Sequence, residues 1–264
     1  MVERYAVIGN PVAHSKSPWI HAEFARATGQ ALRYEAIEAP LGGFAGAVAA
    51  FRAAGGKGLN VTLPFKEEAF ALCDEVSERA RVARAVNTLA FRERVLGDNT
   101  DGVGLVRDLA VNLKADPRGK RVLLMGAGGA ARGVAGGLLE AGAGELVIAN
   151  RTPERAAALA ARFPGVRGCG YETVGTRFDI VVNATSAGLQ GAAPPLPSGV
   201  LGPGVVAYEM VYGRDTPFLA AARAAGARAC DGLGMLVEQA AESFFLWRGV
   251  RPATAPVLER LRRG

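Results

Sequence analysis

The chain has 264 residues, of which 50% are hydrophobic and 21% are charged. This length allows one large domain or two of ordinary size, and the composition excludes a disordered chain, a fibre and a small disulfide-stapled module. The formal net charge of +6 suits an anionic partner such as a phosphate, a carboxylate or a nucleic acid, and charge alone does not choose among these three.

The three cysteines, Cys73, Cys169 and Cys230, lie far apart in the chain. Their odd number and the lack of a Cys-x-x-Cys pair argue against a disulfide framework and against a zinc site, so no metal is expected. No stretch approaches the roughly 18 apolar residues of a membrane span, and Glu3 and Arg4 precede the first short apolar run. We therefore expect a cytoplasmic protein with no targeting segment and no membrane partner.

Short β-rich runs alternate with helical stretches over the first hundred residues. This alternation predicts an α/β fold in which crossover helices connect the strands of a parallel sheet. The expected strands span residues 5–8, 32–37, 58–61, 88–91 and 95–96, and the expected helices begin at Pro18, span about 44–51 and run from Lys66 to about Arg84.

A turn-forming stretch, Asp116-Pro117-Arg118-Gly119, follows a helix expected over residues 101–113 and marks the passage to a second unit. The alternation of strands and helices resumes beyond it. The expected strands span residues 121–125, 145–149, 179–183 and 205–208, and the expected helices end near 141, begin at Pro153 and Thr216, span 235–247 and close the chain at Arg263.

A glycine-rich loop, Gly126-Ala127-Gly128-Gly129-Ala130-Ala131, follows the strand at 121–125 and opens a helix. Within a strand–turn–helix–strand unit of about 30 residues, this pattern predicts a Rossmann-like dinucleotide-binding site. Gly126 would make the tight turn, and Gly128 would let the backbone approach the pyrophosphate at the N-terminus of the helix. Ala131 stands in the place of the third glycine, which the pattern allows.

The residues at the end of the next strand indicate whether the cofactor is NAD or NADP. A carboxylate there would hold the ribose hydroxyl of NAD, but this chain has Asn150, Arg151 and Thr152, with Arg155 a turn later. A guanidinium can bind a 2′-phosphate in a bidentate manner, so NADP is favoured. Thr152 also suits the N-cap of a helix that begins at Pro153, and the two roles are compatible.

Two hydroxyl residues, Ser15 and Ser17, follow the first strand at the mouth of the expected sheet. Beside a helix N-terminus, they could hold the carboxylate of a substrate. The alternative is that Ser17 caps a helix that begins at Pro18 and that His14 is an ordinary loop residue.

Lys66 opens a helix, where a cation opposes the helix dipole. Residues that break a local rule tend to mark functional positions. Asp101 brings a second ionisable group to the expected domain junction. The alternatives are an exposed lysine paired with a neighbouring glutamate and an aspartate that serves as an N-cap.

Taken together, the ordered motifs resemble those of the shikimate dehydrogenases, NADP-dependent enzymes of aromatic amino-acid biosynthesis. The resemblance extends over nearly the whole chain. The matching segments are Gly9-Asn10-Pro11 to Ser17-Pro18, Asn60-Val61-Thr62 to Lys66, Ala85-Val86-Asn87-Thr88, Gly97-Asp98-Asn99-Thr100-Asp101-Gly102, the glycine loop, Asn150-Arg151-Thr152, Asn183-Ala184-Thr185-Ser186, and Asp231-Gly232-Leu233-Gly234-Met235 with Gln239.

The resemblance implies a two-lobed α/β oxidoreductase that reversibly reduces 3-dehydroshikimate to shikimate with NADPH. Residues 1–100 plus 236–264 would form a mainly parallel substrate-binding and catalytic lobe, to which the C-terminal helices return. Residues 101–235 would form the Rossmann-like NADP-binding lobe. The expected partner is the small-molecule substrate, with no nucleic acid and no membrane, and a homodimer is left open.

The resemblance also assigns roles to residues. Lys66 and Asp101 would be the catalytic pair and would also bind the substrate. The substrate-binding residues would be Ser15 and Ser17 for the carboxylate, Asn60, Thr62, Asn87 and Gln239 for the ring hydroxyls, and Tyr212 near the substrate. The cofactor-binding residues would be Gly126, Ala127, Gly128, Gly129 and Ala130 for the pyrophosphate, Asn150, Arg151, Thr152 and Arg155 for the adenosine 2′-phosphate, and Met210 and Gly234 near the nicotinamide. One departure is Glu209, where the family usually has aspartate.

Three other functions agree less well with the sequence. An NAD-dependent quinate/shikimate dehydrogenase is disfavoured by Arg151. A basic nucleic-acid-binding protein is disfavoured because aromatic residues make up only 7% of the chain and the arginines are scattered. A relative that binds the substrate without turnover would be expected to lack Lys66 or Asp101, and this chain has both.

Overall fold

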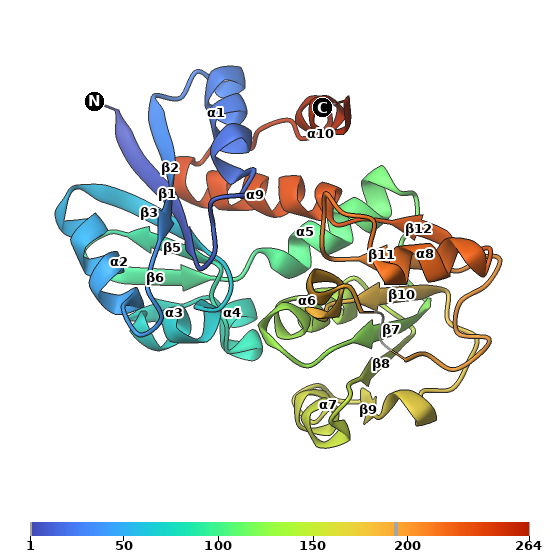
Figure 1. Ribbon diagram of the computed structural model, residues 1–264. Helices are drawn as coiled ribbons and strands as arrows, with labels where there is room; N and C mark the ends of the chain where they lie inside the picture. Colours follow the sequence, from blue (N-terminus) through green and yellow to red (C-terminus); the bar gives the residue numbers. More distant parts are fainter. Residues whose placement is uncertain (1, 193–194, 264) are drawn as a thin grey trace. The chain divides into compact units, whose positions relative to one another are not determined.

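The computed structural model describes residues 2–192 and 195–263, and the chain divides into two compact units (Figure 1). The first unit comprises Met1–Gly104 and Leu236–Gly264, and the second comprises Leu105–Met235. The division expected from the sequence has its first boundary four residues earlier, at 100 instead of 104, and the same return at residue 236. The functions expected of the two parts remain predictions.

The sheet of the first unit has the strand order β2-β1-β3-β5-β6-β4. All neighbouring strands are parallel except that β5 is antiparallel to both β3 and β6. The expected mainly parallel sheet is therefore confirmed, with β5 as the one reversed strand of the part that is described. The strands are β1 (Glu3–Gly9), β2 (Leu32–Glu38), β3 (Gly56–Val61), β4 (Glu75–Val76), β5 (Thr88–Phe91) and β6 (Val95–Asp98).

Helices cover both faces of this sheet, which explains why β1 is apolar over consecutive residues. On one face, Ala6 and Ile8 of β1 belong to a buried cluster with side chains of α2, α3 and α4. On the other face, Tyr5 stacks on Trp247 of α9, with 4.7 Å between the ring centroids. The helices are α1 (Ser17–Thr28), α2 (Phe44–Ala53), α3 (Lys66–Leu72), α4 (Glu78–Ala83), α9 (Leu233–Arg248) and α10 (Ala255–Arg263).

The single helix expected from Lys66 to about Arg84 is wrong, because the chain forms α3, the short strand β4 and α4 instead. Asp74 donates its N–H to the Val95 carbonyl (3.0 Å), and its carboxylate accepts the Val95 N–H (2.7 Å). These bonds join the chain to the edge of β6 rather than to the preceding helical turn. The Ser77 hydroxyl then caps α4 by accepting the N–H of Ala80.

The second unit contains a fully parallel sheet with the strand order β12-β11-β10-β7-β8-β9. The first strand of this unit, β7, lies in the middle, and the strand order reverses between β7 and β10, as in a doubly wound Rossmann-like fold. Ligands of such sheets bind at the carboxyl ends of the strands beside that reversal. The strands are β7 (Arg121–Met125), β8 (Glu145–Ala149), β9 (Arg167–Cys169), β10 (Ile180–Asn183), β11 (Val206–Glu209) and β12 (Arg228–Cys230).

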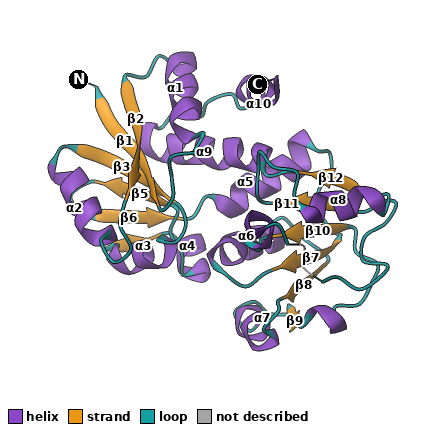
Figure 2. Cartoon of the chain, viewed as in Figure 1, coloured by secondary structure: helices purple, strands orange, loops and turns teal. Residues whose placement is uncertain are grey.

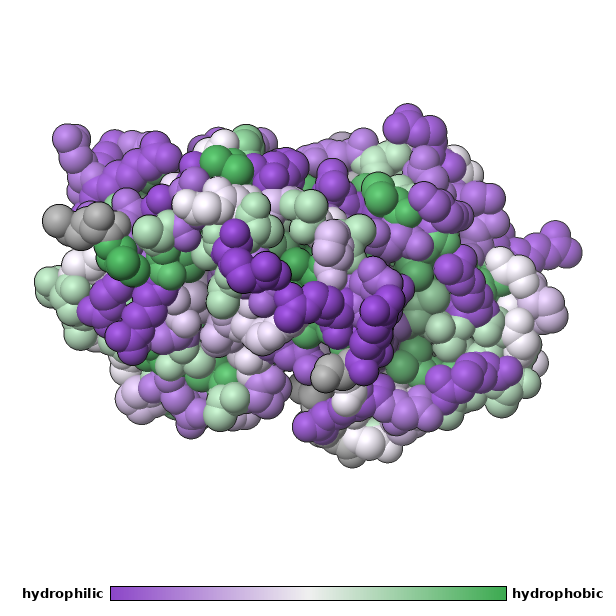
Figure 3. Space-filling view, turned by 90° about the horizontal axis from the view of Figure 1, so that it is seen from above, coloured by the Kyte–Doolittle hydropathy of each residue, from purple (hydrophilic) through white to green (hydrophobic). Residues whose placement is uncertain are grey.

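The helices of the second unit alternate with these strands (Figure 2). They are α5 (Asp101–Arg107), which begins in the first unit and continues as a π-helical turn over Asp108–Asn112, α6 (Gly129–Glu140), α7 (Pro153–Ala160) and α8 (Pro217–Ala224), with short 3₁₀ turns at Tyr171–Thr173 and Ala187–Gln190. None of the helices described is both long and apolar enough to pass through a bilayer. On the face shown in Figure 3, hydrophilic residues predominate and hydrophobic ones lie between them.

Candidate active site

Lys66 and Asp101 form an ion pair in the first unit, in which the Lys66 Nζ contacts Asp101 Oδ2. Each residue is the first of its helix, α3 or α5, and both side chains are largely buried, with 15% and 6% exposed. The carbonyl of Lys66 accepts the N–H of Val86 (2.9 Å), which fixes the start of α3 beside the residue that precedes Asn87. The lysine therefore pairs with Asp101 and not with a neighbouring glutamate.

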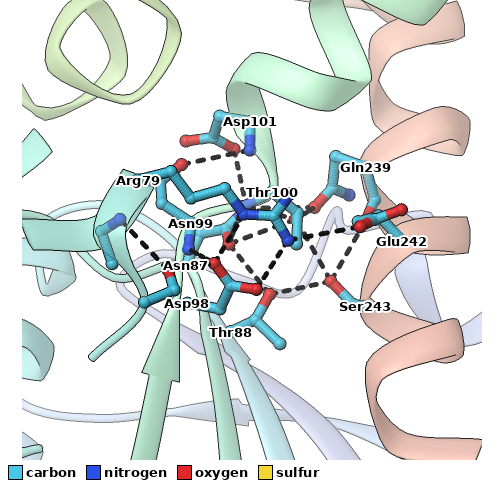
Figure 4. A network of polar contacts seen from close by, with 12 residues as sticks. Arg79, Asn87, Thr88, Asp98, Asn99, Thr100, Asp101, Gln239, Glu242 and Ser243 are labelled. Atoms are coloured by element: carbon cyan, nitrogen blue, oxygen red, sulfur yellow. Dashed lines mark hydrogen bonds and ion pairs between the residues drawn. The ribbon is translucent and has the colours of Figure 1, made fainter. Parts of the chain in front are cut away.

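Asn87 holds the other oxygen of the Asp101 carboxylate (Figure 4). Its Oδ1 accepts the backbone N–H of Thr100 (2.8 Å), and a backbone N–H can only donate. The Asn87 amide can therefore have only one orientation, with its Nδ2 donating to Asp101 Oδ1 at 2.8 Å. Since both carboxylate oxygens accept bonds from side chains, Asp101 is not a simple N-cap.

Two further amides expected to bind substrate belong to the same network. Asn60, at the end of β3, donates from Nδ2 to the Ser243 hydroxyl (2.9 Å) and accepts the Tyr34 hydroxyl at Oδ1 (2.7 Å). Gln239, on α9, donates from Nε2 to the Leu236 carbonyl (2.8 Å) and directs Oε1 toward Asn87 Nδ2 (3.3 Å). The structure thus brings Lys66, Asp101, Asn60, Asn87 and Gln239 into one connected group.

Thr62 and the two serines follow the carboxyl ends of neighbouring parallel strands, β3 and β1. A Cβ added to Gly9, the last residue of β1, would lie only 2.4 Å from Thr62 Cγ2, so these strand ends are in close contact. The loop that leaves Gly9 carries Ser15, whose hydroxyl accepts the N–H of Ser17 (3.2 Å). The expectation that Ser17 caps α1 is wrong, because Lys16 occupies the N-cap and Ser17 is the first helical residue.

The glycine loop lies at the reversal of the second sheet. Gly126 has φ +107°, and a Cβ there would lie 3.1 Å from the carbonyl oxygen of Ala184, just beyond β10. Gly128 is exposed in extended backbone as the N-cap of α6, and the first turn of α6 has neither a side-chain cap nor an acidic residue. The backbone N–H groups at this helix start are suited to the pyrophosphate of a dinucleotide. Ala127, Gly129 and Ala130 complete this loop and the first turn of the helix.

The segment after β8 has free cationic side chains. Arg151 and Arg155 are exposed, and within the described residues neither forms an ion pair. Asn150 donates from Nδ2 to the Thr152 carbonyl (3.0 Å), which folds the segment back on itself. Thr152 occupies the N-cap of α7 as expected, but its hydroxyl makes no capping bond there. These donors fit the 2′-phosphate of NADP.

The segment that holds Gly232 and Gly234 lies against Met210 and Asp108. A Cβ on Gly232 would lie 2.3 Å from the Met210 carbonyl oxygen, and a Cβ on Gly234 would lie 1.9 Å from Asp108 Oδ1. Only glycines allow the segment around them to approach β11 and the π-helical turn this closely. Tyr212 lies half-buried just beyond β11, in the second unit, whereas the other residues expected to bind substrate lie in the first.

Glu209, which departs from the family pattern, ends β11 and is fully buried. Its carboxylate accepts bonds from Asn183 Nδ2 (2.8 Å), the Thr216 hydroxyl (3.0 Å) and the Val211 N–H (3.2 Å). Burial raises the pKa of this carboxyl, and the hydrogen bonds oppose the rise. The longer acid therefore links β10, β11 and the start of α8.

Four side chains that complete the network of the first unit were not predicted as site residues. Thr88 and Thr100 lie in matching motifs beside Asn87 and Asp101, but no role was predicted for either. Tyr34 and Ser243 belong to a strand and a helix with no motif of their own. Spacing offers one signal for Ser243, because it lies four residues after Gln239 and so on the same face of α9.

Shikimate dehydrogenases are among the known proteins that resemble this chain along nearly its whole length. Residues 7–89 match the model of the shikimate dehydrogenase substrate binding domain, residues 108–190 that of shikimate / quinate 5-dehydrogenase, and residues 232–262 that of the shikimate 5′-dehydrogenase C-terminal domain. A protein of Nitrosospira multiformis named shikimate dehydrogenase (NADP(+)) is 60% identical over 269 residues, covering 99% of this chain and 98% of the relative.

Two solved structures are also similar. An Ael1 enzyme from Pseudomonas putida has a TM-score of 0.93 and 53% identity, with 98% of each chain covered. The shikimate 5-dehydrogenase of Thermus thermophilus, solved in complex with NADP(H) and shikimate, has a TM-score of 0.89 and 41% identity, with 99% of each chain covered.

A two-unit α/β fold with a glycine loop at the sheet reversal and a buried lysine–aspartate pair defines an NADP-dependent oxidoreductase that acts on a CH–OH group. The chain belongs to the shikimate dehydrogenase family.

Proposed function

We propose that Lys66 and Asp101 are the acid/base pair with which this chain interconverts 3-dehydroshikimate and shikimate, using NADP. The reaction belongs to the pathway to chorismate and the aromatic amino acids. The observation that carries the assignment of the pair is the buried ion pair itself, held on its aspartate side by Asn87.

The chemistry of ketone reduction explains why this pair is needed. NADPH, when bound, supplies the hydride. Negative charge then develops on the carbonyl oxygen, and Lys66 is placed to neutralise it because its ammonium group has three donors and Asp101 requires only one. Asp101 fixes the direction of the ammonium group, and the proton moves from Nζ to the new hydroxyl. In the oxidation of shikimate, Lys66 takes the proton back.

We assign the substrate to polar groups of the first unit. Ser15, in the loop that follows β1, and Ser17, at the start of α1, bind the carboxylate, and this role is supported by their place after the carboxyl end of a parallel strand. The ring hydroxyls contact Asn60, Thr62, Asn87 and Gln239, three of which share the hydrogen-bonded group of Lys66. Tyr212 is also assigned a place near the substrate.

We assign NADP to the second unit. The pyrophosphate binds the backbone from Gly126 to Ala130, and the nicotinamide lies near Met210 and Gly234. The 2′-phosphate binds Asn150, Arg151, Thr152 and Arg155, a role that the exposed and unpaired guanidinium groups support. A cytoplasmic location, which suits three free thiols, and a homodimer are also proposed, and light scattering on the purified protein tests the second of these.

The first test is the rate of nicotinamide absorbance change with shikimate, run in parallel with NADP and NAD. We expect a strong preference for NADP. Lys66→Ala should lower kcat by at least about 100-fold, near the smaller end of general acid contributions, with little change in KM. Lys57→Ala, which removes an exposed lysine of β3, is the matched control and should keep wild-type kinetics.

A near-wild-type kcat for Lys66→Ala would remove Lys66 as the proton donor. Because loss of the lysine leaves a buried carboxylate without its cation, Asp101→Asn serves as a second variant, in which the amide oxygen can still accept a hydrogen bond from the Lys66 ammonium. It should also lose kcat while it still binds shikimate in calorimetry. A preference for NAD would agree with membership of the family but would contradict the role assigned to Arg151.

A further inference from the structure

Three buried hydroxyl residues that the proposed mechanism does not use contact the amide side chains assigned to the substrate. Thr88, Thr100 and Ser243, here called the hydroxyl cluster, have 1%, 0% and 0% of their surface exposed. They come from β5, from the residue before α5 and from α9, and Figure 4 shows them near Asn87 and Gln239. None of the three is assigned to the substrate, so the effect proposed for them passes through the groups they contact.

The hydrogen bonds of the cluster connect the two amides. Thr88 donates its single hydroxyl proton to Asn87 Oδ1 (2.8 Å), because an amide oxygen only accepts. The Ser243 hydroxyl accepts from Asn60 Nδ2 (2.9 Å), and its one proton has two acceptors in range, Thr88 Oγ1 (2.8 Å) and the Gln239 carbonyl oxygen (3.1 Å). A chain of contacts thus runs from Asn60 through Ser243 and Thr88 to Asn87.

Thr100 closes the network from the other side. Its hydroxyl accepts from Asn87 Nδ2 (2.9 Å) and lies 3.4 Å from Gln239 Oε1. Asn87 Nδ2 lies within hydrogen-bond distance of Asp101, the Thr100 hydroxyl and Gln239 Oε1, and its Oδ1 accepts from Thr88 and from the Thr100 N–H. Such a connected buried network favours one arrangement of its members.

We propose that Thr88, Thr100 and Ser243 are positioning residues for the reaction. The hydroxyl cluster holds the Asn60 amide in place for the substrate and, through Asn87, holds the Asp101 carboxylate toward Lys66. The proposal rests on the proposed function, since it requires Asn60 to be a substrate ligand and Asp101 to be part of the catalytic pair.

Thr88 offers a matched pair of variants. Thr88→Val keeps the shape of the side chain and loses the hydroxyl, whereas Thr88→Ser keeps the hydroxyl and loses a methyl group. Removal of the hydrogen bond should raise the KM for shikimate and weaken shikimate binding in calorimetry about three- to tenfold in the valine variant, the range that one net hydrogen bond covers. The serine variant should stay within about twofold of wild type, and the KM for NADP should not change in either.

Equal losses in the valine and serine variants would show that packing matters rather than the hydroxyl, and unchanged shikimate binding in both would also overturn the proposal. Ser243→Ala is a second variant, should Thr88→Val fail to fold, and is expected to match the valine variant. Thr28→Val, which removes a hydroxyl of α1 bonded only to the Phe24 carbonyl in the part described, should behave as wild type. Wild-type protein that neither binds nor oxidises shikimate would instead contradict the proposed function.

Discussion

His21, on the buried face of α1, is a titratable residue held without hydrogen bonds. Neither ring nitrogen has a partner within the described residues, and no part of the side chain is exposed. The ring stacks on Tyr34 with 4.1 Å between centroids and 4° between planes. Burial lowers the pKa of His21 to about 3, with only a weak opposing effect from Asn60. The folded protein therefore keeps this imidazole neutral well below neutral pH.

This residue should make the first unit less stable in acid. Because the folded pKa lies below the unfolded one, the stabilisation is complete above about pH 6.5 and is lost as the pH falls toward 3, where only the unfolded chain takes the proton. Between about pH 7 and pH 5 the free energy of unfolding should fall by about 2 kcal/mol more in wild type than in His21→Phe. Urea titrations at the two pH values measure this difference.

The exposed His14 provides the control, since His14→Ala should retain the pH dependence of wild type. An identical pH dependence for wild type and His21→Phe would mean that the buried ring is protonated in the folded state or that its burial is relieved in solution.

Helices α5 and α9 approach each other at Gly104, which places backbone against a residue of the active site. A Cβ on Gly104 would lie 2.6 Å from the Cβ of Gln239 and 2.9 Å from its backbone nitrogen. Neither atom is the end of a flexible side chain, so one helix would have to move. The position of Gln239 relative to Asn87 therefore depends on a helix contact that only glycine permits.

Gly104→Ala should destabilise the protein by about 1 to 3 kcal/mol, the usual cost of overpacking, and should raise the KM for shikimate. Gly46→Ala is the opposite case, because Gly46 lies in α2 with no atom within 4 Å of an added Cβ. That variant should gain about 0.5 to 1 kcal/mol from helix propensity and keep the KM. Thermal unfolding and steady-state kinetics on both variants check the pair, and an unchanged KM in Gly104→Ala would contradict the argument.

The elements that sequence patterns predicted well are those whose burial is a property of the segment itself. The runs that became β1, β7 and β8 are apolar and continuous, and the glycines after β7 mark the turn. The patterns missed β4, β9 and β12, which have two or three residues each, because a strand this short has no periodicity and forms only by pairing with a neighbour. The reversal of β5 likewise depends on its partners.

The residues of the site differ in the same way, since some are marked by their own segment and others depend on contacts made only in the fold. Lys66 was predicted because it breaks a local rule, being a cation at a helix start. Ser243 could not be predicted as part of the network, since its role depends on contact with Thr88, which lies 155 residues away in the chain. The orientation of an amide or a hydroxyl is a tertiary property, and no spacing along the chain encodes it.

At the scale of the whole molecule, the two units have separate cores and separate sheets. Each ligand should then protect mainly the unit that binds it, because binding stabilises only the folded form of its own site. Hydrogen exchange with shikimate alone should slow amides within residues 1–104 and 236–264, and exchange with NADP alone should slow those within 105–235. Protection that is greater in the opposite unit than in the ligand's own unit would contradict the assigned roles.

The first unit is interrupted in the chain, since Leu236–Gly264 returns to it after the whole second unit has been completed. On the ribosome, Lys66 and Asp101 emerge early, but Gln239 and Ser243 emerge only after more than a hundred further residues. The second unit can therefore fold during synthesis while the first waits with an uncovered sheet face, and chaperones or proteases would meet that face first. The unit that matches the family's substrate binding domain is thus the last to be finished in every newly made copy.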